Sequence, residues 1–209
     1  METGVTFEAI VLAAGAGVRF GGGKLLAPYQ GAPLLHAALA AAQAAPVRSV
    51  TVVTGAGAEA VSAAVRAFAP EIRIVHATDH AEGMAASLRA GVTTLRQFSR
   101  ALDGALVALC DQPAFSADII AQLLAAQRAT GRSIVAAHYH GRNAAPALFL
   151  REHFATLTAL TGEEGARTLL NGDPACPEPP GGRVASVDLP ALALDLDTPA
   201  DYAAWQQRA

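Results

Sequence analysis

The sequence is poor in the residues that most often build disulfides and metal centres. Its 209 residues include two cysteines: Cys110 ends an apolar run, and Cys176 lies among prolines. A disulfide framework is therefore not expected, and a reducing cytoplasm is the simpler location. Among the six histidines, His138 and His140 would share one face of an extended segment, but no further Cys or His spacing is typical of a zinc site.

Charge excess, long apolar runs and a leader pattern are also missing. The formal net charge is −3, which favours neither nucleic acid nor an anionic membrane surface as a partner. The sequence has no uninterrupted apolar run of about 18 residues, the length that a transmembrane helix needs. The first ten residues, METGVTFEAI, lack the basic and apolar regions of a signal peptide. We therefore expect a protein that binds neither nucleic acid nor a membrane.

What the sequence does contain is an alternation of strand patterns and helix patterns. With 52% hydrophobic residues it can form one substantial core, so we expect a single domain over residues 1–209. Strands that alternate with helices indicate βαβ units, a mainly parallel sheet and a Rossmann-like, three-layer α/β/α fold. The expected strands cover residues 8–13, 48–54, 71–76, 105–110 and 133–137, and the expected helices begin near Pro33 and cover residues 58–68, 84–98 and 117–130.

The alternation weakens after about residue 138. The elements expected in this later part are strands at 145–150, 183–188 and 191–194, a helix from about Glu152, a Pro/Gly loop at 173–182 and a terminal helix from Pro199. We interpret residues 138–198 as an elaboration of the same domain that completes a substrate pocket.

The most distinctive stretch is IVLAAGAGVRFGGGKLL, residues 10–26. An apolar strand leads into a loop with five glycines that carries Arg19 and closes on Lys24. Glycines allow close approach of the backbone to a ligand, and successive N–H groups form an anion-binding concavity, so the loop suits a polyphosphate. It is not a Walker A loop, because Leu25 follows Lys24, and it is not a GxGxxG fingerprint, because Phe20 takes the third glycine's place. A flexible connection with two solvated cations is the alternative.

Carboxylates stand where a divalent metal could join such a loop. Asp111 directly follows the apolar strand at 105–110, and Mg²⁺ prefers one or two carboxylates together with substrate phosphates. Asp195 and Asp197 would point to the same side of an extended segment. The alternatives are that Asp111 caps a turn before Pro113, and that one aspartate of the pair caps the terminal helix.

Five ordered stretches resemble the nucleotidyltransferases related to molybdenum cofactor cytidylyltransferase. The glycine loop matches the pattern LAAGxGxRFGxxKLL at residues 12–26, and the other stretches are EGMAASL, ALVALCDQP, GEEGAR and DLDTPAD. The resemblance covers nearly the whole chain and implies a nucleotide-diphospho-sugar-transferase-like fold, in which residues 138–198 build the acceptor pocket. Two departures are visible: Ala144 and Ala145 replace a glycine and a polar residue before Pro146, and Glu163 fills the acidic position of a GDxGAR element.

The resemblance also implies a role for particular residues. Those implied to bind the nucleotide are Leu12, Ala13, Ala14, Gly15, Gly17, Arg19, Lys24, Thr54, Gly83, Met84 and Ser87. Those implied to act in catalysis are Lys24 and Arg19. Those implied to ligate Mg²⁺, with Mn²⁺ as an alternative, are Asp111, Asp197 and Asp195. Those implied to meet the acceptor are Gln112, Pro146 and Arg167, although Arg167 could instead lie over apolar surface.

The implied reaction is transfer of CMP from CTP to the terminal phosphate of molybdenum cofactor, with release of pyrophosphate. Relatives that transfer CMP tend to read LAAG and DQP, as this chain does at Ala14 and Gln112, whereas those that transfer GMP tend to read LAGG and DTP. A molybdenum hydroxylase apoenzyme or its chaperone is an implied further partner. Cytidylyl transfer to another small phosphate, such as methylerythritol phosphate, is an alternative. A non-catalytic carrier of molybdenum cofactor is the alternative from another class.

Overall fold

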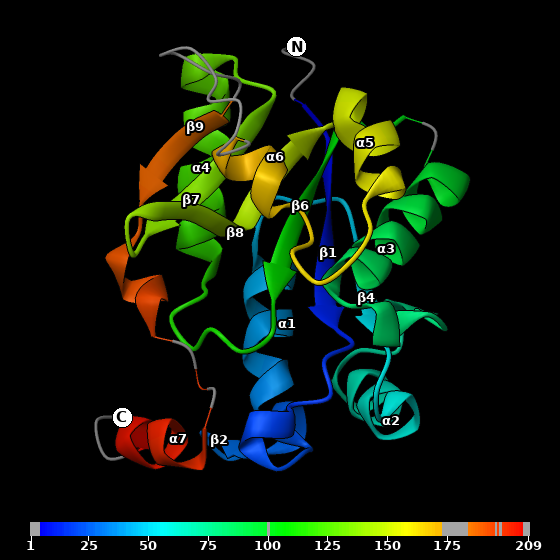
Figure 1. The fold of residues 1–209 in the computed structure, drawn as a ribbon, viewed down its shortest axis with the longest axis vertical. Coiled ribbons are helices and arrows are strands. Elements are labelled where there is room, and N and C mark those ends of the chain that lie inside the picture. Colours follow the sequence, from blue (N-terminus) through cyan, green and yellow to red (C-terminus); the bar gives the residue numbers. More distant parts are fainter. Residues whose placement is uncertain (1–4, 100, 173–183, 195, 197, 207–209) are drawn as a thin grey trace.

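A buried strand, β1 (Phe7–Ala13), is an inner strand of a seven-stranded sheet with the order β5–β4–β1–β6–β8–β7–β9 (Figure 1). The computed structural model describes residues 5–99, 101–172, 184–194, 196 and 198–206. All seven residues of β1 are buried, so both faces of the sheet are covered at this point. β1 pairs in parallel with β4 (Val50–Thr54) on one side and with β6 (Gly104–Leu109) on the other.

The sheet is mainly parallel, as the sequence predicts. Within the described part of this seven-stranded sheet, β8 (Arg142–Leu150) runs antiparallel to both of its neighbours, and the other strand pairs are parallel. β8 follows β7 (Ile134–Tyr139) directly, through a turn in which His140 and Gly141 both have positive φ. The outer strands of the sheet are β5 (Arg73–His76) and β9 (Val184–Asp188).

Helices cover both faces of the sheet, which confirms the three-layer arrangement (Figure 1). Val11 of β1 belongs to the apolar cluster on one face, and Ile10 belongs to the cluster on the other, because successive side chains of a strand alternate. The helices on the Val11 face are α1 (Leu34–Ala44), α2 (Ala58–Phe68) and α4 (Ala117–Thr130). Those on the Ile10 face are α3 (Met84–Phe98), α5 (Phe154–Ala159) and α6 (Arg167–Asn171).

The later part of the chain departs from the sequence prediction in two places. The strand expected at 191–194 is wrong, because this segment forms a 3-10 helix, η5 (Pro190–Ala193), with its proline near the first helical position. The strand expected at 145–150 begins earlier, at Arg142, because it pairs with β7 along its length. The expected Pro/Gly loop at 173–182 lies outside the described residues. In the part of the chain that the structure describes, no helix is both long and apolar enough to cross a membrane.

The C-terminal helix, α7 (Pro199–Gln206), packs beside the segment that follows the glycine loop (Figure 1). That segment contains a small hairpin, β2 (Pro28–Tyr29) and β3 (Ala32–Pro33), whose Tyr29 stacks on Trp205 with ring centroids 6.5 Å apart. Leu196, just before the helix, is fully buried in the same apolar cluster. The sequence pattern predicts the helix but not this packing.

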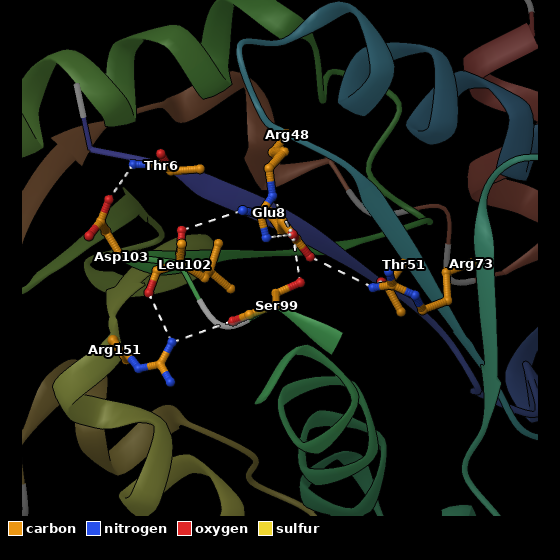
Figure 2. A network of polar contacts seen from close by, with 10 residues as sticks. Thr6, Glu8, Arg48, Thr51, Arg73, Ser99, Leu102, Asp103 and Arg151 are labelled. Atoms are coloured by element: carbon orange, nitrogen blue, oxygen red, sulfur yellow. Dashed lines mark hydrogen bonds and ion pairs between the residues drawn. The ribbon is translucent and has the colours of Figure 1, made fainter. Parts of the chain in front are cut away.

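A polar network closes the amino-terminal end of the central strands (Figure 2). Its centre is Glu8 on β1, whose side chain is buried. Ser99 Oγ and Arg48 Nε donate hydrogen bonds to Glu8 Oε1 at 2.7 Å and 2.8 Å, and Arg73 Nη1 lies 3.7 Å from Glu8 Oε2. A buried carboxylate without such partners would be strongly destabilising, so these three residues make the central strand compatible with a charge.

Neighbouring contacts join the network to the adjacent turns (Figure 2). The N–H of Thr6 donates to Asp103 Oδ2 at 2.7 Å, and Arg151 Nη1 donates to the carbonyl oxygen of Leu102 at 3.3 Å. Arg151 begins the 3-10 helix η4 (Arg151–His153), which leads from β8 into α5. This end of the sheet is therefore held by structural contacts, and the opposite end is left for a ligand.

We expect Glu8→Gln to lower the free energy of unfolding by about 2 kcal/mol, because an amide forms weaker hydrogen bonds with Arg48 and Ser99 than a carboxylate does. Burial alone raises the pKa of the Glu8 carboxyl, but hydrogen bonds from Ser99 and Arg48 leave this pKa below its ordinary value of 4.5. The stabilisation is therefore present above that value and is lost as the pH falls through the lower, folded-state pKa. Urea unfolding of both proteins across this pH range measures the effect.

Glu71→Gln is the matched control, because Glu71 is an exposed glutamate that accepts a hydrogen bond from Gln43 Nε2 at 3.0 Å. We expect its free energy of unfolding to stay within about 0.5 kcal/mol of the unsubstituted protein. A loss in Glu8→Gln that does not shrink towards low pH would contradict the role given to the ionised carboxylate.

Candidate active site

A cavity of about 690 Å³ opens at the carboxyl ends of β1 and β6. Ligands of open α/β sheets bind where the strand order reverses. Here this point is at β1, because the chain continues from β1 to β4 and β5 on one side and then to β6 on the other side. The glycine loop, the start of α3 and the end of β6 form its walls. The residues expected from the sequence that line it are Leu12, Ala13, Ala14, Gly15, Gly17, Arg19, Lys24, Gly83, Met84, Ser87 and Asp111.

The glycine loop is folded into two short 3-10 turns, η1 (Val18–Phe20) and η2 (Lys24–Leu26). The carbonyl oxygen of Gly17 accepts hydrogen bonds from the N–H groups of Phe20 at 2.9 Å and Gly22 at 3.0 Å, which turns the chain back on itself. Gly17 has φ of +58°, and a Cβ atom there would lie 3.2 Å from Lys24 Cβ. Glycine is therefore required where the start of the loop meets its end.

A lysine and an aspartate meet inside the cavity. Lys24 Nζ lies 2.9 Å from Asp111 Oδ2, and the lysine side chain is only 8% exposed. Lys24 is also the one lysine of the sequence, which has 15 lysine and arginine residues together. The loop after β1 and the end of β6 are thus joined by an ion pair that is largely shielded from water.

The segment that precedes α7 lies beside Asp111. The N–H of Leu196 donates to the carbonyl oxygen of Asp111 at 3.3 Å. Asp195 and Asp197, which flank Leu196 in the sequence and were expected to complete a metal site, lie outside the described residues. The expected proximity of this segment to Asp111 is therefore seen at Leu196.

Asp201 brings a further carboxylate towards the loop. Thr198 donates to Asp201 Oδ2 from its N–H at 2.9 Å and from its hydroxyl at 2.7 Å, which caps the start of α7. These two hydrogen bonds hold the pKa of the Asp201 carboxyl below its ordinary value, and the charges of Lys24 and Arg19 lower it further. On the far side of the loop, the ring of Phe20 meets Tyr202 edge-on, with centroids 5.7 Å apart.

The chemistry of Asp111 suits a divalent metal. Its Oδ2 atom accepts from Lys24, but its Oδ1 atom is buried and has no hydrogen-bond partner among the described residues. A carboxylate oxygen of this kind is a ligand that Mg²⁺ and Mn²⁺ prefer. No group of three His, Cys, Asp or Glu side chains that could hold a metal is found within the described ranges.

The wall opposite the loop is made by the start of α3 and a turn from the later part of the chain. A Cβ atom on Gly83 would lie 2.7 Å from Glu163 Cα and 2.8 Å from the Gly162 carbonyl oxygen, so the two backbones approach as closely as glycine allows. The N–H of Ala85 donates to the same Gly162 oxygen at 3.2 Å. Glu163 itself lines the cavity, so the region after residue 138 contributes to this site.

Several lining residues have no signal in the sequence that selects them. His80, in the 3-10 helix η3 (His80–Glu82), stands just before the predicted helix start, and that position is its only clue. Its Nδ1 atom lies 3.0 Å from the carbonyl oxygen of Ala77, so Nδ1 carries the proton. Cys110 also lines the cavity, where its Sγ donates to the Leu12 carbonyl oxygen at 3.2 Å. Burial raises the pKa of the Cys110 thiol, which makes it a poor nucleophile.

Four of the expected site residues do not line the cavity. Thr54 is buried, and its hydroxyl donates to the Val75 carbonyl oxygen at 3.3 Å. Gln112 is buried as well, and its Nε2 donates to Tyr139 Oη at 2.8 Å. Pro146 is buried in β8, and Arg167 is exposed at the start of α6.

These features together define the class of protein. A mainly parallel sheet, a glycine-rich loop after its first strand, and a buried lysine beside a carboxylate at the strand ends are the parts of an α/β nucleotidyltransferase. The family model described as the MobA-like NTP transferase domain matches residues 9–178, and the chain belongs to this family. The family expected from the sequence is thereby confirmed, and the protein is a nucleotidyltransferase.

Individual proteins resemble the chain over most of its length. The nicotine blue oxidoreductase of Paenarthrobacter nicotinovorans is 35% identical over 175 residues, which are 79% of this chain and 81% of that protein. The crystal structure of Rv0371c from Mycobacterium tuberculosis H37Rv has a TM-score of 0.77 at 28% identity and covers 98% of this chain and 100% of its own, and a manganese complex of Rv0371c has a TM-score of 0.74. A nucleotidyl transferase from Methanothermobacter, with a TM-score of 0.76 at 22% identity over 97% of both chains, shares the fold.

The position after β4 generates a prediction about the cavity wall. A Cβ atom on Gly55 would lie 2.7 Å from Ala14 Cβ and 2.8 Å from His80 Cβ, between two residues that line the cavity. We expect Gly55→Ala to lower the free energy of unfolding by about 1–3 kcal/mol, because backbone on both sides must move. Chemical denaturation measures this loss.

Gly15→Ala serves as the control for stability. A Cβ atom on Gly15 meets nothing within 4 Å, so its free energy of unfolding should stay within about 0.5 kcal/mol of the original. Equal losses in Gly15→Ala and Gly55→Ala would show that close packing at Gly55 is not the cause.

Proposed function

We propose that this protein transfers CMP from CTP to the terminal phosphate of molybdenum cofactor and releases pyrophosphate. The observation that carries the proposal is the pair formed by Lys24 and Asp111 in the cavity, where one carboxylate oxygen is bound to the ammonium and the other has no hydrogen-bond partner among the described residues. A cation and such a carboxylate oxygen beside a glycine loop suit a triphosphate with its metal. The sequence features LAAG and DQP, with Ala14 and Gln112, support CTP as the donor.

In the proposed reaction, the triphosphate lies over the loop at residues 14–17, with Arg19 and Lys24 beside its phosphates. An oxygen of the acceptor phosphate attacks the α-phosphorus of CTP and forms a new P–O bond. The bond from that phosphorus to the bridging oxygen breaks, and pyrophosphate leaves with the electron pair. Lys24 stabilises the charge that develops on the α-phosphate and the leaving group, so the protein acts by positioning and electrostatics without a covalent intermediate.

Mg²⁺ is the proposed metal, with Mn²⁺ as an alternative that the manganese complex of Rv0371c supports. Asp111 would hold it, together with Asp197 and Asp195 from outside the described residues. When bound, the metal would supply further neutralisation of phosphate charge. Asp111 would offer its Oδ1 atom to the metal, while its Oδ2 atom accepts from Lys24.

The remaining assignments extend the same proposal. Gly83, Met84 and Ser87 line the cavity at the start of α3 and are proposed to hold the nucleoside. Thr54 is proposed to help position the nucleotide, although its side chain is buried and does not line the cavity. The residues proposed for the acceptor side are Gln112, Pro146 and Arg167. We also propose that residues 1–209 act as one domain, in the cytoplasm, and that the product passes to a molybdenum hydroxylase apoenzyme or its chaperone.

Three other functions remain as outcomes of the test. Methylerythritol phosphate or another small phosphate could replace molybdenum cofactor as the acceptor. A carrier would bind molybdenum cofactor without any reaction of CTP, but it would have no use for a buried lysine and carboxylate. An oxidoreductase is suggested by the name of the Paenarthrobacter relative. The glycine loop argues against an oxidoreductase, because Phe20 occupies the position of the third glycine in the dinucleotide-binding pattern GxGxxG.

The deciding experiment crosses four nucleoside triphosphates with two acceptors in the presence of Mg²⁺ and measures pyrophosphate. We expect release with CTP and molybdenum cofactor, and little with GTP or with methylerythritol phosphate. Tight binding of molybdenum cofactor without pyrophosphate from any triphosphate would support a carrier instead. Oxidation of a reduced nicotinamide in a parallel assay would support the oxidoreductase.

Substitution of the lysine tests the mechanism. We expect Lys24→Ala to lower kcat by about 100-fold to 1,000-fold, the usual effect of removing one preorganised stabilising group. Arg66→Ala, an exposed cation on α2, is the control for loss of one positive charge and should keep full activity. Full turnover in Lys24→Ala would contradict the proposed role of Lys24 in stabilising the phosphate charge.

A further inference from the structure

Arg89 on α3 joins three separate segments through one guanidinium group. Its Nη2 atom donates to the carboxylates of Asp79 and Glu82, the latter at 2.7 Å, and its Nη1 atom donates to the carbonyl oxygen of Leu160 at 2.9 Å. The side chain is 20% exposed, so these bonds are partly shielded from water. A rigid, planar fork of donors can satisfy all three acceptors at once, whereas the single ammonium of lysine cannot hold the same directions.

Two of these segments form the wall opposite the glycine loop. Asp79 and Glu82 bound the two residues of η3 that line the cavity. Leu160 leads into the turn at 162–163, which meets Gly83 as closely as backbone can and contributes one lining residue. Arg89 is not among the lining residues, so any effect it has on a ligand passes through these segments.

Arg89 neutralises two carboxylates that lie close together at this wall of the cavity. Asp79 and Glu82 place two like charges at the two ends of η3, three residues apart in the sequence. The hydrogen bond from Arg89 is the main reason that the pKa of the Asp79 carboxyl lies below its ordinary value. The Arg89 guanidinium therefore holds the carboxylates of Asp79 and Glu82 close together and also bonds the backbone at Leu160.

We propose that Arg89 is a positioning residue that aligns η3 with the turn at 162–163 and so sets the shape of the nucleoside side of the cavity. This inference rests on the proposed function for the identity of the ligand, but the alignment itself is a property of the free protein. The function proposed above assigns no role to Arg89, since Arg89 does not line the cavity.

The first arm of the experiment needs no ligand. Backbone hydrogen exchange is compared in the unsubstituted protein, in Arg89→Ala and in Arg96→Ala, where Arg96 is an exposed arginine two turns further along the same helix. Arg89→Ala should raise exchange together in residues 79–87 and 160–165 and leave β1 and β6 unchanged. Unchanged exchange in either segment overturns the inference, and so does a uniform rise across the sheet.

The second arm measures CTP with Mg²⁺ by calorimetry and by steady-state kinetics. Arg89→Ala should raise both the Kd and the KM for CTP by about tenfold, with kcat at saturating CTP within about threefold, because positioning of the wall is lost while Lys24 and Asp111 stay in place. Methylguanidinium added to Arg89→Ala should restore the affinity, and it should have no effect on Arg96→Ala.

The two arms separate failure of this inference from failure of the proposed function. If the unsubstituted protein binds CTP and Arg89→Ala binds it within twofold, the inference is overturned and the proposed function stands. If the unsubstituted protein binds no triphosphate, the proposed function fails, and hydrogen exchange still decides whether Arg89 aligns the wall.

Discussion

The complete burial of β1 is the constraint on which the rest of the structure depends. With parallel partners on both edges and helices on both faces, this strand has no route to water along its seven residues. A charge at its first end must therefore be matched locally, as Glu8 is matched by Arg48 and Ser99. At its other end, the chain leaves the sheet as the glycine loop. The buried strands below this loop hold its first residues in place.

The regular part of the fold could be predicted because it is encoded locally. The segments at 58–68, 84–98 and 117–130 have helical spacing or caps of their own, and the structure has helices with the same bounds. The late region is different, because the bounds of its strands are set by pairing with neighbouring strands of the sheet and not by a pattern within each segment. The pairing of β7 with β8 extends β8 to Arg142, and a proline turns the segment expected as a strand into η5.

The same distinction applies to the candidate site. The loop residues and Asp111 could be selected because each combines a special residue type with the end of a predicted strand. His80 and Glu163 could not, because Glu163 reaches the cavity through the close approach of Gly83 to the turn at 162–163, and His80 lies beside Gly55. In the opposite sense, Thr54 and Gln112 stand at strand ends, yet both side chains turn towards the interior, where the Thr54 hydroxyl donates to a carbonyl oxygen and the Gln112 amide nitrogen donates to a hydroxyl.

The packing of α7 on the loop has a consequence for how the protein is made. Synthesis proceeds from the amino terminus, so Phe20 and Tyr29 leave the ribosome long before the rings of Tyr202 and Trp205 that cover them. The sheet can assemble from the earlier part of the chain, but these two aromatic side chains stay uncovered until then. The glycine loop and the hairpin after it therefore receive this aromatic cover only after strands β1 to β9 have been synthesised.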